Sequence, residues 1–149
     1  MYLKLLLVCS LMFACKSQNT ASMASENQPG YQILIKDSHS NISEPVLKEI
    51  QNEEELAQLM SQINSTRKPG FPYPEVDFTQ HRIGFANLGQ KNTGGYSVTI
   101  DRVEQEATQT RVFLKTTHPG MMATSVITTP FVLFRIDNDK PLLLEYSEE

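Results

Sequence analysis

The second half of the chain alternates apolar and polar residues, which is the two-residue period of half-buried β-strands. In the segment 95–101, Tyr96, Val98 and Ile100 fall on one face of such a strand. The segment 110–116 alternates in the same way. Both segments are therefore predicted to be strands with one apolar face.

The remaining strand predictions rest on short apolar runs bounded by turn residues. The run 131–136 is almost continuously apolar, as a strand buried on both faces would be. The other predicted strands lie at 31–35, 46–50, 82–86 and 142–146.

One amphipathic helix is predicted after Asn52, a good N-cap residue that Glu55 follows three positions later, as in a capping box. Its apolar residues form a single helical stripe: Leu56, Leu59, Met60 and Ile63. A Pro-Gly pair at 69–70 follows its end. One helix among several strands predicts an α+β domain with a largely antiparallel sheet.

The N-terminal segment has the features of a bacterial lipoprotein signal. Lys4 precedes an apolar run, and a second apolar stretch at 11–14 leads into Cys15. The run is shorter than the ~20 residues of a membrane-spanning helix. We therefore expect a signal peptide at 1–14 and a Cys15 that carries diacylglycerol and further acyl chains such as palmitate. This lipid would anchor the protein to a membrane of the cell envelope, with the domain outside the cytoplasm; an ordinary secretory leader is the alternative.

Composition limits the chemistry of the mature protein. Residues 15–30 comprise the modified cysteine and a small, polar segment, which predicts a flexible tether before a folded domain at 31–149. Cys9 would leave with the signal, so the domain would have no thiol nucleophile and no cysteine ligand for zinc. A net charge of −4 and the absence of a basic stripe argue against nucleic acid as a partner.

The most distinctive short segment is Asn92-Thr93-Gly94-Gly95-Tyr96, between two predicted strands. Its adjacent glycines permit positive φ and the close approach of another backbone. One interpretation is a hairpin turn that needs glycine for its geometry alone. The other is an exposed loop with an aromatic anchor, which contacts a protein partner.

Several short motifs occur in a characteristic order: EVDF at 75–78, IGFANLG at 83–89, TGGYSV at 93–98, PG at 119–120 and TPFVL at 129–133. In this order and spacing they resemble the C-terminal domain of PrcB, the lipoprotein subunit of a bacterial surface protease complex. The resemblance extends over residues 46–146. It implies an α+β domain, a lipid anchor and an accessory role beside a protease, and it supplies no active site.

The loop 92–96 is also similar to a loop of chagasin-like inhibitors, in which an Asn-Pro-Thr-Thr-Gly-Tyr segment enters the cleft of papain-type cysteine proteases. The proline of that segment is missing here, and so is the companion Gly-x-Gly-Gly loop. The segment 129–131, Thr-Pro-Phe, is only a distant substitute for an Arg-Pro-aromatic loop. A cysteine-protease inhibitor acting through 92–96 is the alternative function.

Histidines and methionines give no clear metal site. His39, His81 and His118 are far apart and lack the spacing of metal ligands. His118 with Met121 and Met122 offers soft ligands of the kind that copper prefers. A loop histidine beside flexible methionines is the simpler interpretation.

The acidic segments also have plain interpretations. The run 137–139, Asp-Asn-Asp, lacks the glycine and distal glutamate of a calcium loop and is typical of a hairpin turn. Glu75 and Asp77 are interpreted as solvated carboxylates near a strand. We therefore expect a non-catalytic protein without metal or cofactor. Its expected partner is another protein, and the resemblance makes a protease the candidate.

Replacing the expected lipid site tests the anchor. Cys15→Ala should release the protein from membranes, because no other segment of the sequence is apolar enough to anchor it. Detergent-free washing and fractionation of cells measure the release. A variant that stays as firmly membrane-bound as the parent would contradict the lipoprotein prediction.

Overall fold

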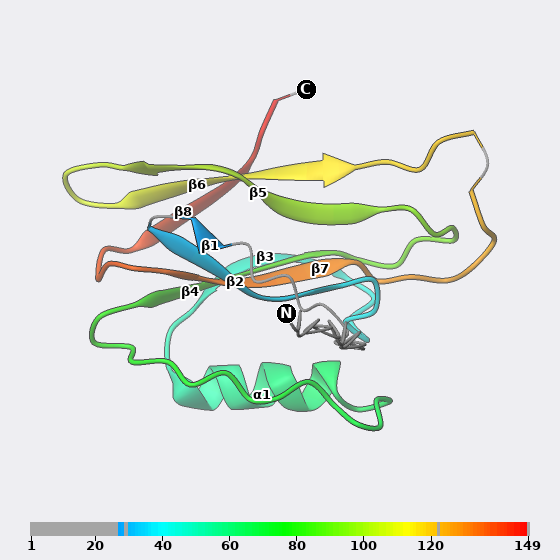
Figure 1. The fold of residues 1–149 in the computed structure, drawn as a ribbon, viewed down its shortest axis with the longest axis horizontal. Helices are drawn as coiled ribbons and strands as arrows, with labels where there is room; N and C mark the ends of the chain where they lie inside the picture. The colour runs from blue at the N-terminus through cyan, green and yellow to red at the C-terminus, as the bar shows by residue number, and fades with distance from the viewer. Residues whose placement is uncertain (1–26, 29, 122, 149) are drawn as a thin grey trace, which may run out of the picture.

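Two β-sheets are stacked on each other, and a helix covers the outer face of the larger sheet (Figure 1). This arrangement comes from a computed structural model that describes residues 27–28, 30–121 and 123–148. In chain order the elements are β1 (Asn27–Gln28), β2 (Tyr31–Asp37), β3 (Pro45–Ile50), α1 (Glu53–Ile63), β4 (Arg82–Leu88), β5 (Ser97–Gln105), β6 (Thr110–Thr117), β7 (Phe131–Ile136) and β8 (Leu142–Tyr146).

The larger sheet has the strand order β1-β2-β7-β4-β3, and all its pairs are antiparallel. The smaller sheet has the order β5-β6-β8, in which β5 and β6 are antiparallel and β8 is parallel to β6. The predicted α+β class with mainly antiparallel pairing is therefore confirmed. Its strands form two sheets where the sequence pattern indicated one.

The strand β7 contributes side chains to two hydrophobic cores, one on each face of the larger sheet. Phe131 and Leu133 pack with the helix, whereas Val132, Phe134 and Ile136 pack against the smaller sheet. All five side chains are fully buried, which confirms the prediction that 131–136 is covered on both faces.

The neighbouring strand β4 has a glycine where the ring of Phe134 needs space. Gly84 is paired with Phe134, and a Cβ atom at residue 84 would lie 2.1 Å from Cζ of that ring. Any side chain at residue 84 would therefore displace the ring or separate the two strands.

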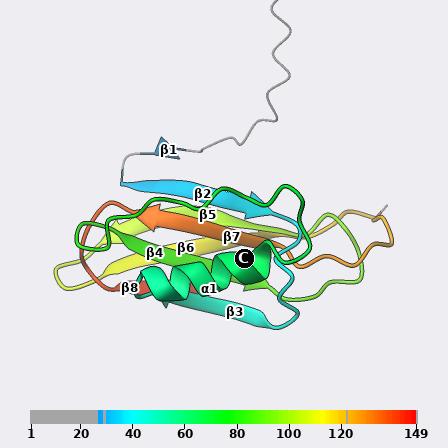
Figure 2. The same cartoon turned by 90° about the horizontal axis from the view of Figure 1, so that it is seen from below.

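The helix α1 forms where the sequence predicts it. The Asn52 side chain accepts a hydrogen bond from the Glu55 backbone N–H at 3.0 Å, and Glu55 Oε2 accepts one from the Gln51 backbone N–H at 3.0 Å. This is the reciprocal arrangement of a capping box, shifted by one residue on its return bond. The predicted apolar stripe is buried in the core shared with the larger sheet. Figure 2 shows α1 lying across that sheet.

The segment 137–139 was interpreted as a hairpin turn, and this interpretation is wrong. It follows β7 in the larger sheet and precedes β8 in the smaller sheet, so it belongs to a crossing between sheets. Asn138 supports the crossing, because its side-chain amide donates to Thr110 Oγ1 at 2.9 Å.

The predicted tether and lipid site fall largely outside the described residues. Cys15 is not among them, and of residues 15–30 the structure describes Asn27, Gln28 and Gly30. The first two form β1 and pair with β2. Within the described ranges, no helix is both long and apolar enough to cross a membrane.

Truncating the helix stripe should cost substantial stability. Leu59 is 6% exposed, so Leu59→Ala is expected to lower the free energy of unfolding by about 2–5 kcal/mol. Glu54→Ala, at an exposed position of the same helix, should change it by less than about 0.5 kcal/mol. Urea denaturation of both variants provides the measurement, and equal losses would contradict the assigned helix face.

Candidate functional site

Two long loops lie side by side at one end of the stacked sheets (right in Figure 1). Residues 89–96 connect β4 to β5, and residues 118–130 connect β6 to β7. Lys91 and Thr128 exchange backbone hydrogen bonds of 2.8 and 2.9 Å, and the Gly94 N–H donates to Thr124 O at 2.9 Å. We call the described residues of these loops, 89–96, 118–121 and 123–130, the two-loop tip.

The Asn-Thr-Gly-Gly segment is not a hairpin turn, because β4 and β5 belong to different sheets. Its glycines instead allow close contact between the two loops. Gly95 has a φ of +90°, and a Cβ atom there would lie 2.9 Å from Cβ of Pro119. The interpretation as a hairpin turn is therefore wrong, although the need for glycine is real.

The five residues predicted to bind a partner differ in exposure. Asn92 and Gly95 are exposed, whereas Thr93, Gly94 and Tyr96 are partly buried. Thr93 is held in place because its carbonyl accepts a hydrogen bond from Thr128 Oγ1 at 3.1 Å. Only part of this segment is thus available for contact.

Tyr96 stabilises the base of the tip. Its ring packs against the core between the two sheets and meets the His118 ring edge-on at a centroid distance of 5.5 Å. The Lys91 Nζ atom lies 5.5 Å from the centroid of the same ring. Tyr96 therefore fixes the two loops to the core more than it presents itself to solvent.

The exposed apolar side chains of the tip come from the other loop. Met121 is fully exposed, and Ile127 and Val126 are 61% and 41% exposed. Sequence reasoning missed the last two, and it considered Met121 only as a copper ligand. The available signal was an apolar pair, Val-Ile, inside a Thr- and Ser-rich loop without strand alternation. Several exposed apolar side chains on one loop are a common feature of interaction surfaces.

The two-loop tip has no acidic side chain, although the whole chain has a net negative charge. Residues 89–96 and 118–130 contain no aspartate or glutamate, and their basic side chains are those of Lys91 and His118. A partner with an apolar patch and an acidic border would therefore meet no carboxylate repulsion here.

A buried hydrogen-bond network supports the base of the tip. The Asn87 side-chain amide donates to Glu44 O at 2.7 Å and to Ile42 O at 2.9 Å. Its oxygen accepts from Ser40 Oγ at 2.8 Å, and the Ser40 backbone N–H donates to Thr129 Oγ1 at 2.8 Å. Because Asn87, Ser40 and Thr129 are buried, this network joins the loop before β3 to the end of the second tip loop.

The tip and the start of the folded domain lie at opposite ends of the larger sheet. Phe131, which directly follows the second tip loop, pairs with Asp37 at the end of β2. Tyr31, at the start of β2, pairs with Ile136 at the far end of β7. The chain therefore enters the sheet about 20 Å from the tip, the length of a seven-residue strand.

Asp77, one of the acidic residues considered from the sequence, has a structural role. Asp77 accepts hydrogen bonds from the Thr79 hydroxyl, the Thr79 backbone N–H and the Gln80 side chain, and these bonds lower its pKa. It therefore shapes a turn and does not form a carboxylate pair with Glu75. Over the part of the chain that the structure describes, no three His, Cys or acidic side chains are placed to hold a metal ion. Met122 lies outside that part.

Comparison with known families finds a similarity to the PrcB C-terminal family in the segment that contains this site. The family model described as PrcB C-terminal matches residues 85–137, from within β4 to the end of β7, and this confirms the resemblance. The match includes both tip loops, whereas the motif at 75–78 and the helix lie outside it. Searches of curated proteins and of solved structures found no match.

Replacing the amide of Asn87 should loosen the base of the tip. Asn87→Asp keeps the shape but loses both donors to the Ile42 and Glu44 carbonyls, and it buries a charge beside them. The free energy of unfolding should fall by about 3–5 kcal/mol. Asn92→Asp makes the same exchange at an exposed position of the tip and should change it by less than about 0.5 kcal/mol. Urea denaturation gives both values, and a stable Asn87→Asp variant would contradict the role of the network.

Proposed function

We propose that this chain is a non-catalytic bacterial envelope lipoprotein whose PrcB-like domain binds a protein partner through the two-loop tip. In this proposal the lipid on Cys15 holds the domain at the membrane, and the domain acts as an accessory to a protease complex. The observation that carries the proposal is the exposed apolar group of Met121, Val126 and Ile127 on a tip without carboxylates.

The tip lies away from the point where the tether would join the domain. The tether would join the domain at Tyr31, at the opposite end of β2 from the tip. A flexible tether on a lipid-bearing Cys15 would therefore leave the tip accessible to a protein partner. The PrcB C-terminal match includes both tip loops, which supports a role for the tip in the family's accessory function.

A charge at the tip should abolish partner binding. Ile127→Asp places a carboxylate at one of the exposed apolar positions of the tip, and recovery of the partner by crosslinked pull-down from the native envelope should fall at least about tenfold. Tyr73→Asp, at an exposed position beside the start of α1, is the matched control and should recover the parent's partners. Equal recovery with both variants would refute the tip as the docking surface, and recovery of a protease with the parent alone would support the accessory role.

The alternative function, inhibition of papain-type cysteine proteases, draws support from the same loop. Asn92 is exposed at the end of a two-sheet fold, where it could enter a protease cleft. The pull-down variants do not separate the two functions, so the full chain is also titrated into papain. Stoichiometric inhibition that Asn92→Ala with Thr93→Ala relieves would favour the inhibitor, whereas unchanged papain activity would favour the accessory role.

A further inference from the structure

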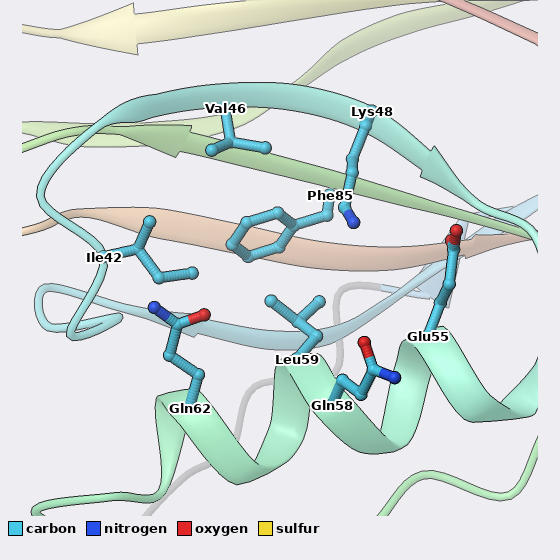
Figure 3. Close-up of a pocket in the computed structure, with 8 residues that line it drawn as sticks. All are labelled: Ile42, Val46, Lys48, Glu55, Gln58, Leu59, Gln62 and Phe85. Atoms are coloured by element: carbon cyan, nitrogen blue, oxygen red, sulfur yellow. The ribbon is translucent and has the colours of Figure 1, made fainter.

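A groove separates α1 from β3, and none of its lining residues belongs to the two-loop tip (Figure 3). It has a volume of about 300 Å³, at the lower end of the range for ligand sites. Its floor is apolar and its rim is polar: the floor has Ile42, Val46, Leu59 and Phe85, and the rim has Lys48, Glu55, Gln58 and Gln62. We call it the β3 groove.

The groove runs along a free sheet edge. β3 is the last strand of the larger sheet, and within the described ranges no strand pairs with its outer side. The Leu88 N–H donates to Pro130 O, on the β7 side of β4. Because antiparallel bonds alternate, Val46 and Lys48 bond to β4, and the backbone groups of Leu47 and Glu49 face outward. An extended backbone is the chemical complement of such an edge.

The side chains of β3 disfavour pairing of this edge with β3 of a second copy of the chain. A symmetric antiparallel pair centred on Lys48 would place two ammonium groups opposite each other. A pair centred on Leu47 would set Glu49 opposite Pro45, which has no N–H to donate. A pair centred on Val46 would set Glu44 opposite Lys48, but it would place Pro45 opposite Leu47 and lose the same donor on both chains. The edge therefore suits a strand of different sequence.

The charge and shape of the groove indicate which side chains a strand added to β3 would carry. Val46 and Lys48 both point from β3 toward α1, so the added strand would present alternate side chains to the same side (Figure 3). A carboxylate opposite Lys48 would pair with its ammonium group. An apolar side chain two residues away, opposite Val46, would lie over the floor formed by Leu59 and Phe85.

We propose that the β3 groove binds an extended peptide segment of a partner protein, which adds to the outer edge of β3. The segment has an acidic residue opposite Lys48 and a bulky apolar residue two positions away in the groove. This site is separate from the two-loop tip, so the domain has a second binding surface.

A synthetic peptide tests the inference directly. The probe is a nine-residue peptide that alternates threonine and valine and has a glutamate and a leucine two positions apart on one face. It is added to the isotope-labelled full chain, and amide hydrogen exchange is followed by NMR. Exchange at the Leu47 and Glu49 amides should slow on binding, whereas the same peptide with N-methylated backbone amides should have no effect.

A charge swap tests the orientation of the peptide. Lys48→Glu should weaken binding of the glutamate peptide about three- to tenfold and should restore it for a peptide with lysine in place of glutamate. Lys115→Glu, at an exposed position of β6, is the control and should leave binding of both peptides unchanged. Failure of the glutamate peptide to slow exchange at Leu47 and Glu49 at millimolar concentration would overturn the proposal. Slowed exchange when the protein alone is concentrated would assign the edge to a second copy and would also overturn it.

Discussion

The antiparallel pairing of β4 with β7 is the interaction on which the rest of the structure depends. Both strands are buried on both faces, so each contributes side chains to the core under the helix and to the core between the sheets. The pairing requires Gly84, because the Phe134 ring occupies the space of its side chain. Asn87 also pairs with Phe131, and this contact brings the start of one tip loop beside the end of the other. The geometry of the tip is therefore a direct result of the central strand pair.

Sequence patterns predicted the elements of this fold but not their assembly. The helix and the strand β7 were recognised because a helical stripe and a continuous apolar run depend on local periodicity. The crossing at 137–139 was mistaken for a hairpin turn, and a hairpin turn was one of the two interpretations of the crossing at 92–95, since both kinds of connection use glycine, asparagine and aspartate to turn the chain. The parallel pairing of β8 with β6 was not predicted either, because it joins strands separated by all of β7.

The candidate site, too, was predicted only where a local sequence pattern marks it. The Gly-Gly pair marked the first tip loop correctly, because positive φ at Gly95 is a local requirement. The only local sign of exposure for Val126 and Ile127 is their place in a Thr- and Ser-rich loop, and the folded chain shows that they and Met121 are exposed. The motifs that carry the family resemblance are also structural: Asn87 holds the loops, and Gly89 has a φ of +70° with Ser43 O 2.9 Å from the position of a Cβ atom. The motifs behind the family resemblance therefore predict the structure of the tip and do not indicate a chemical activity.

The two proposed surfaces draw on different parts of the chain. The tip lies entirely within the segment that matches the PrcB C-terminal family. The β3 groove is built from residues 42–62, outside that segment, and only Phe85 on its floor belongs to both. Phe85 is fully buried and pairs with Leu133 of β7, so the groove rests on the same central strands that position the tip. A partner bound at the tip would therefore contact the segment that matches the family model, whereas a peptide in the groove would contact residues that lie mostly outside it.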